Sequence, residues 1–244
     1  MFSAATTRSE AMDRVISPVA FISTDFDEKF GIPRQSCLVK ESEGVIHFVG
    51  KYNDKAAIKG LEDFSHLWLL WDFSESPAGQ SLTVCPPRLG GKVKKGVFAT
   101  RSPYRPNGIG LSCVKLEKIV YAGDGPELHV SGVDMLDGTP IFDIKPYMPY
   151  SDCFPEADGG FGQENSDFRI KVDFPEELLE KIPADKRLAV LHILEQDPRA
   201  AYNKESGYVY GLSYAGYDIR FQASEERIVV IDVINKPGDF EKIK

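Results

Sequence analysis

A basic loop bounded by proline and glycine is the part of this sequence whose residue types and spacing most clearly favour chemistry. The stretch GVFATRSPYRPNGIG, residues 96–110, contains Arg101 and Arg105 and no acidic residue. Pro103 and Pro106 fix the backbone φ angle and lower the entropy that the loop loses when it becomes ordered. Arginine forks match the geometry of carboxylate and phosphate groups. The loop is therefore predicted to hold an anion, although a surface loop with two solvated arginines would have the same sequence pattern.

An acidic and aromatic stretch, DMLDGTPIFDIKPYMPYSD at residues 134–152, is the second candidate for chemistry. Its acidic and tyrosine side chains include Asp134, Asp137, Asp143 and Tyr147. The last three are the predicted catalytic candidates, because a positioned carboxylate or tyrosine can accept a proton from a reacting group. Carboxylates and backbone carbonyls could also hold a cationic cofactor. The structural alternative is that the Asp-Gly-Thr-Pro sequence at 137–140 is simply a β-turn.

The charge of the chain is unevenly distributed. The formal net charge is −8 at pH 7, which argues against indiscriminate nucleic-acid binding. Residues 76–116 nevertheless contain no Asp or Glu. The basic residues of that segment are Arg88, Lys92, Lys94, Lys95, Arg101, Arg105 and Lys115. An acidic protein with one basic segment is predicted to bind a polyanion selectively. The alternative is that these side chains only solvate loops.

The cysteine, histidine and apolar patterns argue against several other classes of protein. The four cysteines form no CxxC pair and the four histidines form no HExxH motif, so we expect reduced thiols and no metal. The longest apolar run, residues 67–71, is too short to cross a membrane. The N-terminal residues contain no apolar signal region, and a cytoplasmic protein is expected.

Short strand-like runs separated by turns dominate the first 150 residues. The expected strands are 14–23, 36–42, 44–50, 66–73, 109–121, 126–135 and 140–150. A short helix is expected at 53–60, with Asn53 as its cap. The Ala-Gly-Asp-Gly sequence at 122–125 predicts a hairpin. This mostly-β pattern favours a sandwich or a barrel. A dinucleotide-binding fold is excluded, because the Gly-Ile-Gly at 108–110 lacks the third glycine and precedes a strand.

A smaller α+β segment is expected after a polar linker. Residues 183–198 predict a helix that ends at Pro198. Residues 208–222 and 226–234 predict three strands.

Six motifs, occurring in order between residues 12 and 235, carry a resemblance to a known family. They are IPRQ, GLEDFSHLW, PPRLGG, GVFATRSPYRPNGIGLS, LDGTPIFDIKPY and EQDPRAAY. The chain strongly resembles the TsaA-like family, and within it the TrmO-type tRNA methyltransferases. The resemblance implies a compact single-sheet β-barrel that binds S-adenosylmethionine, followed by a small α+β C-terminal domain. The implied division is a flexible N-terminus at 1–11, the barrel at 12–150, a linker at 151–170 and the C-terminal domain at 171–244.

The resemblance also implies an activity and a set of cofactor contacts. The activity is methylation of the N6 nitrogen of threonylcarbamoyladenosine next to the anticodon of tRNA, by a homodimer. Carried over by position, the cofactor contacts are Pro33, Arg34, Gln35, Ser74, Glu75, Arg101, Leu111, Asp137, Gly138, Thr139 and Pro140. Some relatives have His-Gln where this chain has Ser74 and Glu75.

Chemistry suggests which residues would meet the RNA. The expected partner is a tRNA anticodon stem-loop carrying threonylcarbamoyladenosine, which presents phosphates, a carboxylate and unstacked bases. The candidates for its recognition are Lys94, Lys95, Tyr104, Arg105 and Arg199. Two alternatives stay open: a non-catalytic module that binds S-adenosylmethionine or RNA, and a methyltransferase acting on a small metabolite. The C-terminal EQDPRAAY motif favours the tRNA enzyme over both.

Overall fold

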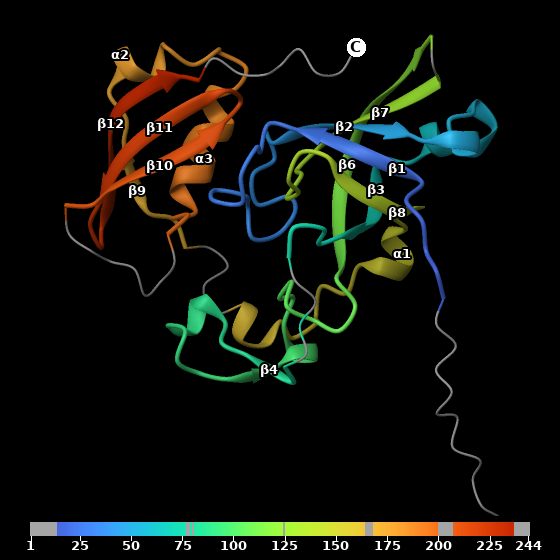
Figure 1. Ribbon diagram of the computed structural model, residues 1–244, viewed down its shortest axis with the longest axis horizontal. Helices are drawn as coiled ribbons and strands as arrows, with labels where there is room; N and C mark the ends of the chain where they lie inside the picture. Colours follow the sequence, from blue (N-terminus) through green and yellow to red (C-terminus); the bar gives the residue numbers. More distant parts are fainter. Residues whose placement is uncertain are drawn as a thin grey trace, which may run out of the picture.

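A closed barrel of six strands forms the N-terminal part of the computed structural model (Figure 1). The structure describes residues 14–76, 79, 81–123, 125–163, 168–199 and 207–236. The flexible N-terminus expected at 1–11 lies outside these residues. The strands follow one another around the barrel in the order β1-β2-β7-β6-β3-β8, and every neighbouring pair is antiparallel. Their bounds are β1 Ala20–Thr24, β2 Glu43–Phe48, β3 His66–Asp72, β6 Ile109–Ala122, β7 Gly125–Ser131 and β8 Thr139–Pro146. The predicted single-sheet β-barrel is confirmed.

Alternation along the strands fills the barrel with apolar side chains. In β3, Leu67, Leu69 and Trp71 are buried, while the residues between them are only partly buried. This period of two places every second side chain inside the barrel. The other fully enclosed interior residues include Ala20, Ile22, Ile46, Val114, Leu128 and Ile141. The barrel is therefore a packed core, and space for a ligand has to lie at one of its ends.

The hairpin expected at 122–125 is confirmed. Strand β7 pairs along its whole length with residues 115–122 of β6, and the ladder closes with Ala122 opposite Gly125. Gly125 has a φ of 134°, a backbone conformation that side-chain-bearing residues rarely adopt. The turn residues therefore fix the register of this pair.

Two expectations for the segments around β2 were wrong. Residues 36–42 form turns instead of a strand, and β2 pairs with β1 and β7 instead. Cys37 has a φ of 61°, which a regular strand does not allow. Its N–H donates a hydrogen bond to the carbonyl of Gly132. The helix expected at 53–60 is a 3-10 turn, η2 (Lys55–Ile58), capped by Asp54 instead of Asn53. Four residues before a positive-φ Gly60 are too few for an α-helix.

A small lobe and the segment after β8 lie beside the barrel (Figure 1). The lobe contains a two-stranded ribbon, β4 (Thr83–Val84) and β5 (Lys95–Gly96), with short turns η4 (Pro87–Leu89) and η5 (Val97–Ala99). The 3-10 turns η1 (Gly50–Tyr52) and η3 (Leu61–Asp63) flank η2. After β8 come α1 (Pro149–Asp152) and η6 (Gly160–Gly162).

The C-terminal part is a four-stranded sheet with helices packed beside it. Its order is β10-β11-β12-β9. The strand bounds are β9 Lys171–Asp173, β10 Val209–Tyr214, β11 Tyr217–Ala223 and β12 Arg227–Asn235. The three expected strands are confirmed as β10, β11 and β12. The three-residue β9, parallel to β12, was not expected, because so short a strand leaves no alternation to detect. The helices are α2 (Glu176–Leu179) and α3 (Arg187–Glu195), so the helix expected at 183–198 is shorter than predicted.

The loop between β1 and β2 joins the two parts. Phe30 in this loop stacks on Tyr210 of β10, with ring centroids 6.4 Å apart. Lys186 Nζ lies 2.8 Å from a carboxylate oxygen of Asp25, and the His192 ring lies 2.7 Å from a carboxylate oxygen of Glu41. Asp25 and Phe30 of this loop thus contact the C-terminal part, and the 36–42 segment that was expected to be a strand contributes Glu41.

Candidate active site

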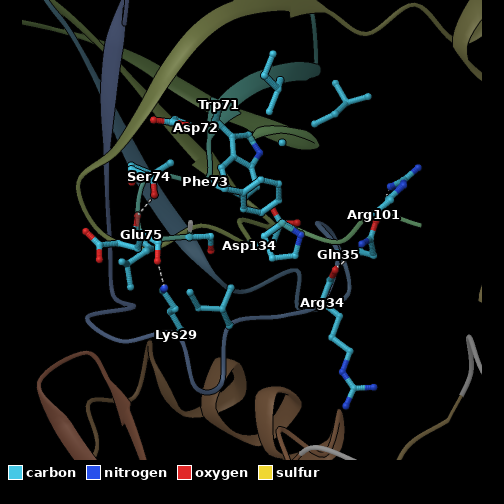
Figure 2. Close-up of a pocket in the computed structure, with 18 of the residues that line it drawn as sticks. Lys29, Arg34, Gln35, Trp71, Asp72, Phe73, Ser74, Glu75, Arg101 and Asp134 are labelled. Atoms are coloured by element: carbon cyan, nitrogen blue, oxygen red, sulfur yellow. Dashed lines mark hydrogen bonds between the residues drawn. The ribbon is translucent and has the colours of Figure 1, made fainter. Parts of the chain in front are cut away.

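One cavity lies at the barrel end where β3 finishes and where β6 and β8 begin. Its volume is about 440 Å³. Four segments contribute to its lining: 29–35 from the β1–β2 loop, 71–76 from the end of β3 onward, 100–111 from the basic loop and the start of β6, and 134–139 up to the start of β8. Figure 2 shows these side chains converging from separate parts of the chain. The barrel therefore brings together most of the motifs that the sequence singled out.

Aromatic and aliphatic side chains form one wall of the cavity. The rings of Trp71 and Phe73 lie 4.3 Å apart at 60°, and Ile109 and Leu111 are exposed beside them. Gly110 is opposite Trp71 in the β3–β6 ladder. A Cβ at this glycine would lie 2.3 Å from the Trp71 indole, so only glycine lets the ring lie across the strand. This wall suits a planar apolar group such as a nucleobase.

Residues of the IPRQ motif and the basic loop meet at the opposite side. Arg101 is exposed and donates a hydrogen bond to Oε1 of Gln35, whose amide nitrogen in turn donates to the carbonyl of Arg34. The two motifs are 66 residues apart in the chain. Because Gln35 is neutral, Arg101 keeps its positive charge available at the cavity mouth.

Arg34 turns away from this group toward the C-terminal part (Figure 2). One of its guanidinium nitrogens donates to the carbonyls of Asp197, at 3.2 Å, and Arg199, at 3.3 Å. Arg34 therefore connects the cavity wall to the EQDPRAAY motif.

A carboxylate that the sequence did not single out as a site lies in the cavity wall. Asp134 accepts a hydrogen bond of 2.6 Å from Ser112 Oγ, and Trp71 Nε1 donates to the same hydroxyl at 3.0 Å. Burial raises the pKa of Asp134 to about 6, against the lowering effects of the Ser112 hydrogen bond and the Arg101 charge. In the sequence, Asp134 belongs to the acidic stretch 134–152 and lies between the apolar Val133 and Met135.

The expected cofactor residues divide into two groups. Eight of them line the cavity: Pro33, Arg34, Gln35, Ser74, Glu75, Arg101, Leu111 and Thr139. Three do not line it and belong to the neighbouring turn: Asp137, Gly138 and Pro140. The carbonyl of Glu75 accepts a hydrogen bond from Lys29, which ties the 71–76 segment to the β1–β2 loop. The cofactor-binding roles themselves stay predictions.

The three catalytic candidates lie outside the cavity lining. Asp137 Oδ1 accepts a hydrogen bond from the backbone N–H of Thr24 at 2.9 Å. Asp143 Oδ2 lies 2.7 Å from Lys145 Nζ. The ring of Tyr147 packs 5.7 Å from that of Trp68. Their proposed proton-transfer roles stay predictions that this geometry does not favour.

The RNA candidates also have different surroundings. Lys94 and Tyr104 are exposed, and the ammonium of Lys95 lies 5.4 Å from the ring centroid of Phe161. Arg105 lines the cavity and donates to the carbonyl of Thr100 at 3.1 Å. Arg199 is only 3% exposed, because Asp197 holds its guanidinium. This burial does not favour the expected contact between the Arg199 side chain and RNA, which stays a prediction.

Other kinds of site are not evident in the described part of the chain. It contains no group of three or more His, Cys, Asp or Glu side chains placed to hold a metal ion. A second hollow of about 350 Å³ lies between residues 29–34 and 193–198, next to the first cavity. Among the described helices, none is long and apolar enough to span a bilayer.

The fold and the cavity define a class: a β-barrel protein with a cavity at one barrel end and an appended α+β part. Comparison with known families makes this specific. Residues 21–153 match the tRNA-methyltransferase O N-terminal domain, and residues 167–236 match the TrmO C-terminal domain. The chain belongs to the tRNA-methyltransferase O family.

Individual relatives support this assignment over nearly the whole chain. A tRNA (adenine(37)-N6)-methyltransferase of Escherichia coli K12 is 39% identical over 216 residues, covering 85% of this chain and 92% of the relative. A Pseudomonas aeruginosa protein, provisionally named an S-adenosylmethionine-dependent methyltransferase, is 38% identical over 232 residues, covering 91% and 98%. A crystal structure of TrmO from P. aeruginosa superposes with a TM-score of 0.74 at 34% identity, covering 93% of this chain and 99% of that one.

Proposed function

We propose that this chain transfers a methyl group from S-adenosylmethionine to the N6 nitrogen of adenosine 37 in tRNA. The family assignment and the relatives named as tRNA (adenine(37)-N6)-methyltransferases support this reaction. The acceptor we propose is the threonylcarbamoyl form of the base. A homodimer, a cytoplasmic location and the domain division at 12–150 and 171–244 are part of the same proposal and rest on the sequence and its resemblance.

The residues around the cavity fit the chemistry of this methyl donor. When bound, S-adenosylmethionine supplies a methyl group on a positively charged sulfur. Its carboxylate would bind a cation, and Arg101 presents a guanidinium at the cavity mouth beside Gln35. Its adenine would pack against an apolar wall, which Phe73 and Leu111 provide.

The observation that carries the proposal is the meeting of the IPRQ motif with the basic loop. Gln35 and Arg101, which are 66 positions apart, form a hydrogen bond in a cavity that also has an apolar wall and the partly buried carboxylate of Asp134. The threonyl group of the proposed acceptor carries its own carboxylate, and Lys29 and Arg105 are further cations in the lining. A single cavity of about 440 Å³ thus offers cations for two carboxylates.

The test uses labelled S-adenosylmethionine with tRNA that does or does not carry threonylcarbamoyladenosine. Label in the modified tRNA alone is the expected result. Label in both tRNAs would show the N6 reaction without recognition of the threonyl carboxylate. Binding of S-adenosylmethionine with label in neither tRNA would overturn the enzyme proposal and favour a non-catalytic module.

A further inference from the structure

Asp134 differs from the other carboxylates of the cavity in how firmly it is held. Asp72 and Glu75 also line the cavity, but within the described residues neither side chain is joined to the barrel wall by hydrogen bonds. Asp134 is bound to Ser112, and Ser112 to Trp71. Figure 2 shows Asp134 below Trp71 and Phe73, among the side chains that surround the cavity.

The direction of every proton in this chain of hydrogen bonds is determined by the groups themselves. The Trp71 indole N–H can only donate, so Ser112 Oγ accepts from it at 3.0 Å. The single hydroxyl proton of Ser112 is then directed to Asp134 Oδ1, at 2.6 Å. Hydrogen bonds of this kind stabilise the ionised carboxylate and restrict its rotation.

The barrel ladder explains why these three residues meet. Gly110 and Ser112 are two positions apart on β6, so they face the same side of the strand, and both are buried. The indole of Trp71 passes over Gly110 and reaches Ser112. Asp134 follows β7, the strand paired with β6, and approaches Ser112 from that side.

We propose that Asp134 is the proton acceptor of the methyl transfer, with Ser112 and Trp71 as the positioning residues that hold its carboxylate. This inference rests on the proposed function. The N6 lone pair forms a bond to the methyl carbon, while the methyl–sulfur bond breaks and its electron pair stays on sulfur. The N6 proton moves to a carboxylate oxygen of Asp134. A positive sulfonium and a negative carboxylate thus become a neutral thioether and a neutral acid.

The surroundings of Asp134 favour this outcome. A partly buried site disfavours charge, so a step that removes one positive and one negative charge gains from the burial. Burial raises the pKa of Asp134 to about 6, close to neutral pH, where a general base acts most effectively. Such a base is needed because N6 of a carbamoylated adenine is a weakly basic, urea-like nitrogen.

The test compares Asp134→Asn and Ser112→Ala with the wild-type chain and with Asp63→Asn, a control on an exposed turn outside the cavity. Single-turnover methylation is measured from pH 5 to 9, together with the Kd for S-adenosylmethionine. We expect Asp134→Asn to slow the transfer at least about 100-fold while the Kd changes less than about threefold. Ser112→Ala should move the acidic limb of the wild-type profile upward by about one pH unit, because the carboxylate loses a stabilising donor.

Each other outcome is decisive. The inference is overturned, and the proposed function left intact, if the wild type is active, Asp134→Asn is equally active and Ser112→Ala does not shift the acidic limb of the pH profile. A Kd weakened tenfold or more with the rate of the bound complex preserved would make Asp134 a cofactor contact instead. If Asp134→Asn does not fold, the limb shift of Ser112→Ala decides. A wild type that methylates neither tRNA would instead refute the proposed function.

Discussion

Arg101 and Arg199 each lie within two residues of a proline, but one side chain is exposed and the other is buried. Arg101 lies in the basic loop, is exposed and hydrogen bonds to the neutral Gln35. Arg199 directly follows Pro198, is 3% exposed and is held by Asp197 at 2.8 and 3.0 Å and by the carbonyl of Ser224 at 2.8 Å. The sequence predicted a ligand contact for both.

The difference teaches that a nearby acid decides what such an arginine does. Asp197 is two residues before Arg199 and forms an ion pair with it. This ion pair offsets part of the desolvation free energy that burial of the guanidinium costs. The loop at 96–110 contains no acid, so the charge of Arg101 is not cancelled within the loop. An arginine in a rigid loop is therefore a better ligand candidate when the loop lacks a carboxylate.

The largest expected effect is on stability, when Arg199, the buried one of the two arginines, is removed. Arg199→Ala should lower the free energy of unfolding by about 3–5 kcal/mol, because it leaves Asp197 without its partner. Urea unfolding followed by circular dichroism measures this. Arg227→Ala is the matched control, since its pair with Asp173 is half exposed and is expected to contribute at most about 1 kcal/mol. A loss as small as that of the control would break the comparison.

The next effect concerns the carboxylate of the cavity. The folded-state pKa of Asp134 is about 6 and the unfolded value is 3.8, so the folded state binds the proton more tightly. Relative to Asp134→Asn, the wild type should lose stability as the pH rises from about 4 through about 6. Above that range Asp134→Asn should be more stable, by on the order of 1–3 kcal/mol. Thermal unfolding at pH 4 and pH 8 checks this, and an equal stability difference at both values would contradict it.

A smaller effect is expected for the exposed arginine. Arg101→Ala should weaken S-adenosylmethionine binding about tenfold, because a charge-assisted hydrogen bond is lost. The free energy of unfolding should change by less than about 0.5 kcal/mol. Calorimetric titration against the exposed control Lys92→Ala measures the affinity. An unchanged affinity would reassign Arg101 to the RNA substrate.

The smallest effect is expected for the lysines of the lobe. Lys94→Ala combined with Lys95→Ala should weaken tRNA binding several-fold and reduce the slope of log K against log salt by about one for each lost phosphate contact. Binding of S-adenosylmethionine should not change. Filter binding at several salt concentrations gives the slope, and a slope equal to that of the wild type would show that these lysines do not contact phosphate.

Local patterns were enough to predict much of the fold. The Trp- and Leu-rich run at 66–73 and the Gly-containing turn at 122–125 predicted barrel strands and their hairpin, because both signals come from neighbouring residues. The strand expected at 36–42 was wrong for the same reason. Its apolar run at 37–39 is compatible with a strand, but Cys37 lies in a positive-φ turn, where its N–H donates to the carbonyl of Gly132, a residue far away in the chain.

The candidate site was predictable in part. The IPRQ motif and the basic loop were recognised, and Gln35 and Arg101 meet as members of one cavity. Among the acids of the 134–152 stretch, however, the sequence favoured Asp137 and Asp143 over Asp134. Asp134 and Asp137 come before β8 and Asp143 lies within it, and the hydrogen bond from Ser112 of β6 distinguishes Asp134.

By itself, the sequence determined a mostly-β barrel, an acid-free basic loop and an ordered set of motifs, because composition, periodicity and turn residues act over short stretches of chain. Only the tertiary structure decided that Asp134 lies in the cavity wall, that Arg34 reaches the carbonyl of Asp197 and that Arg199 is buried. Burial, pKa and hydrogen-bond partners depend on residues that folding brings together from as far as 186 positions away.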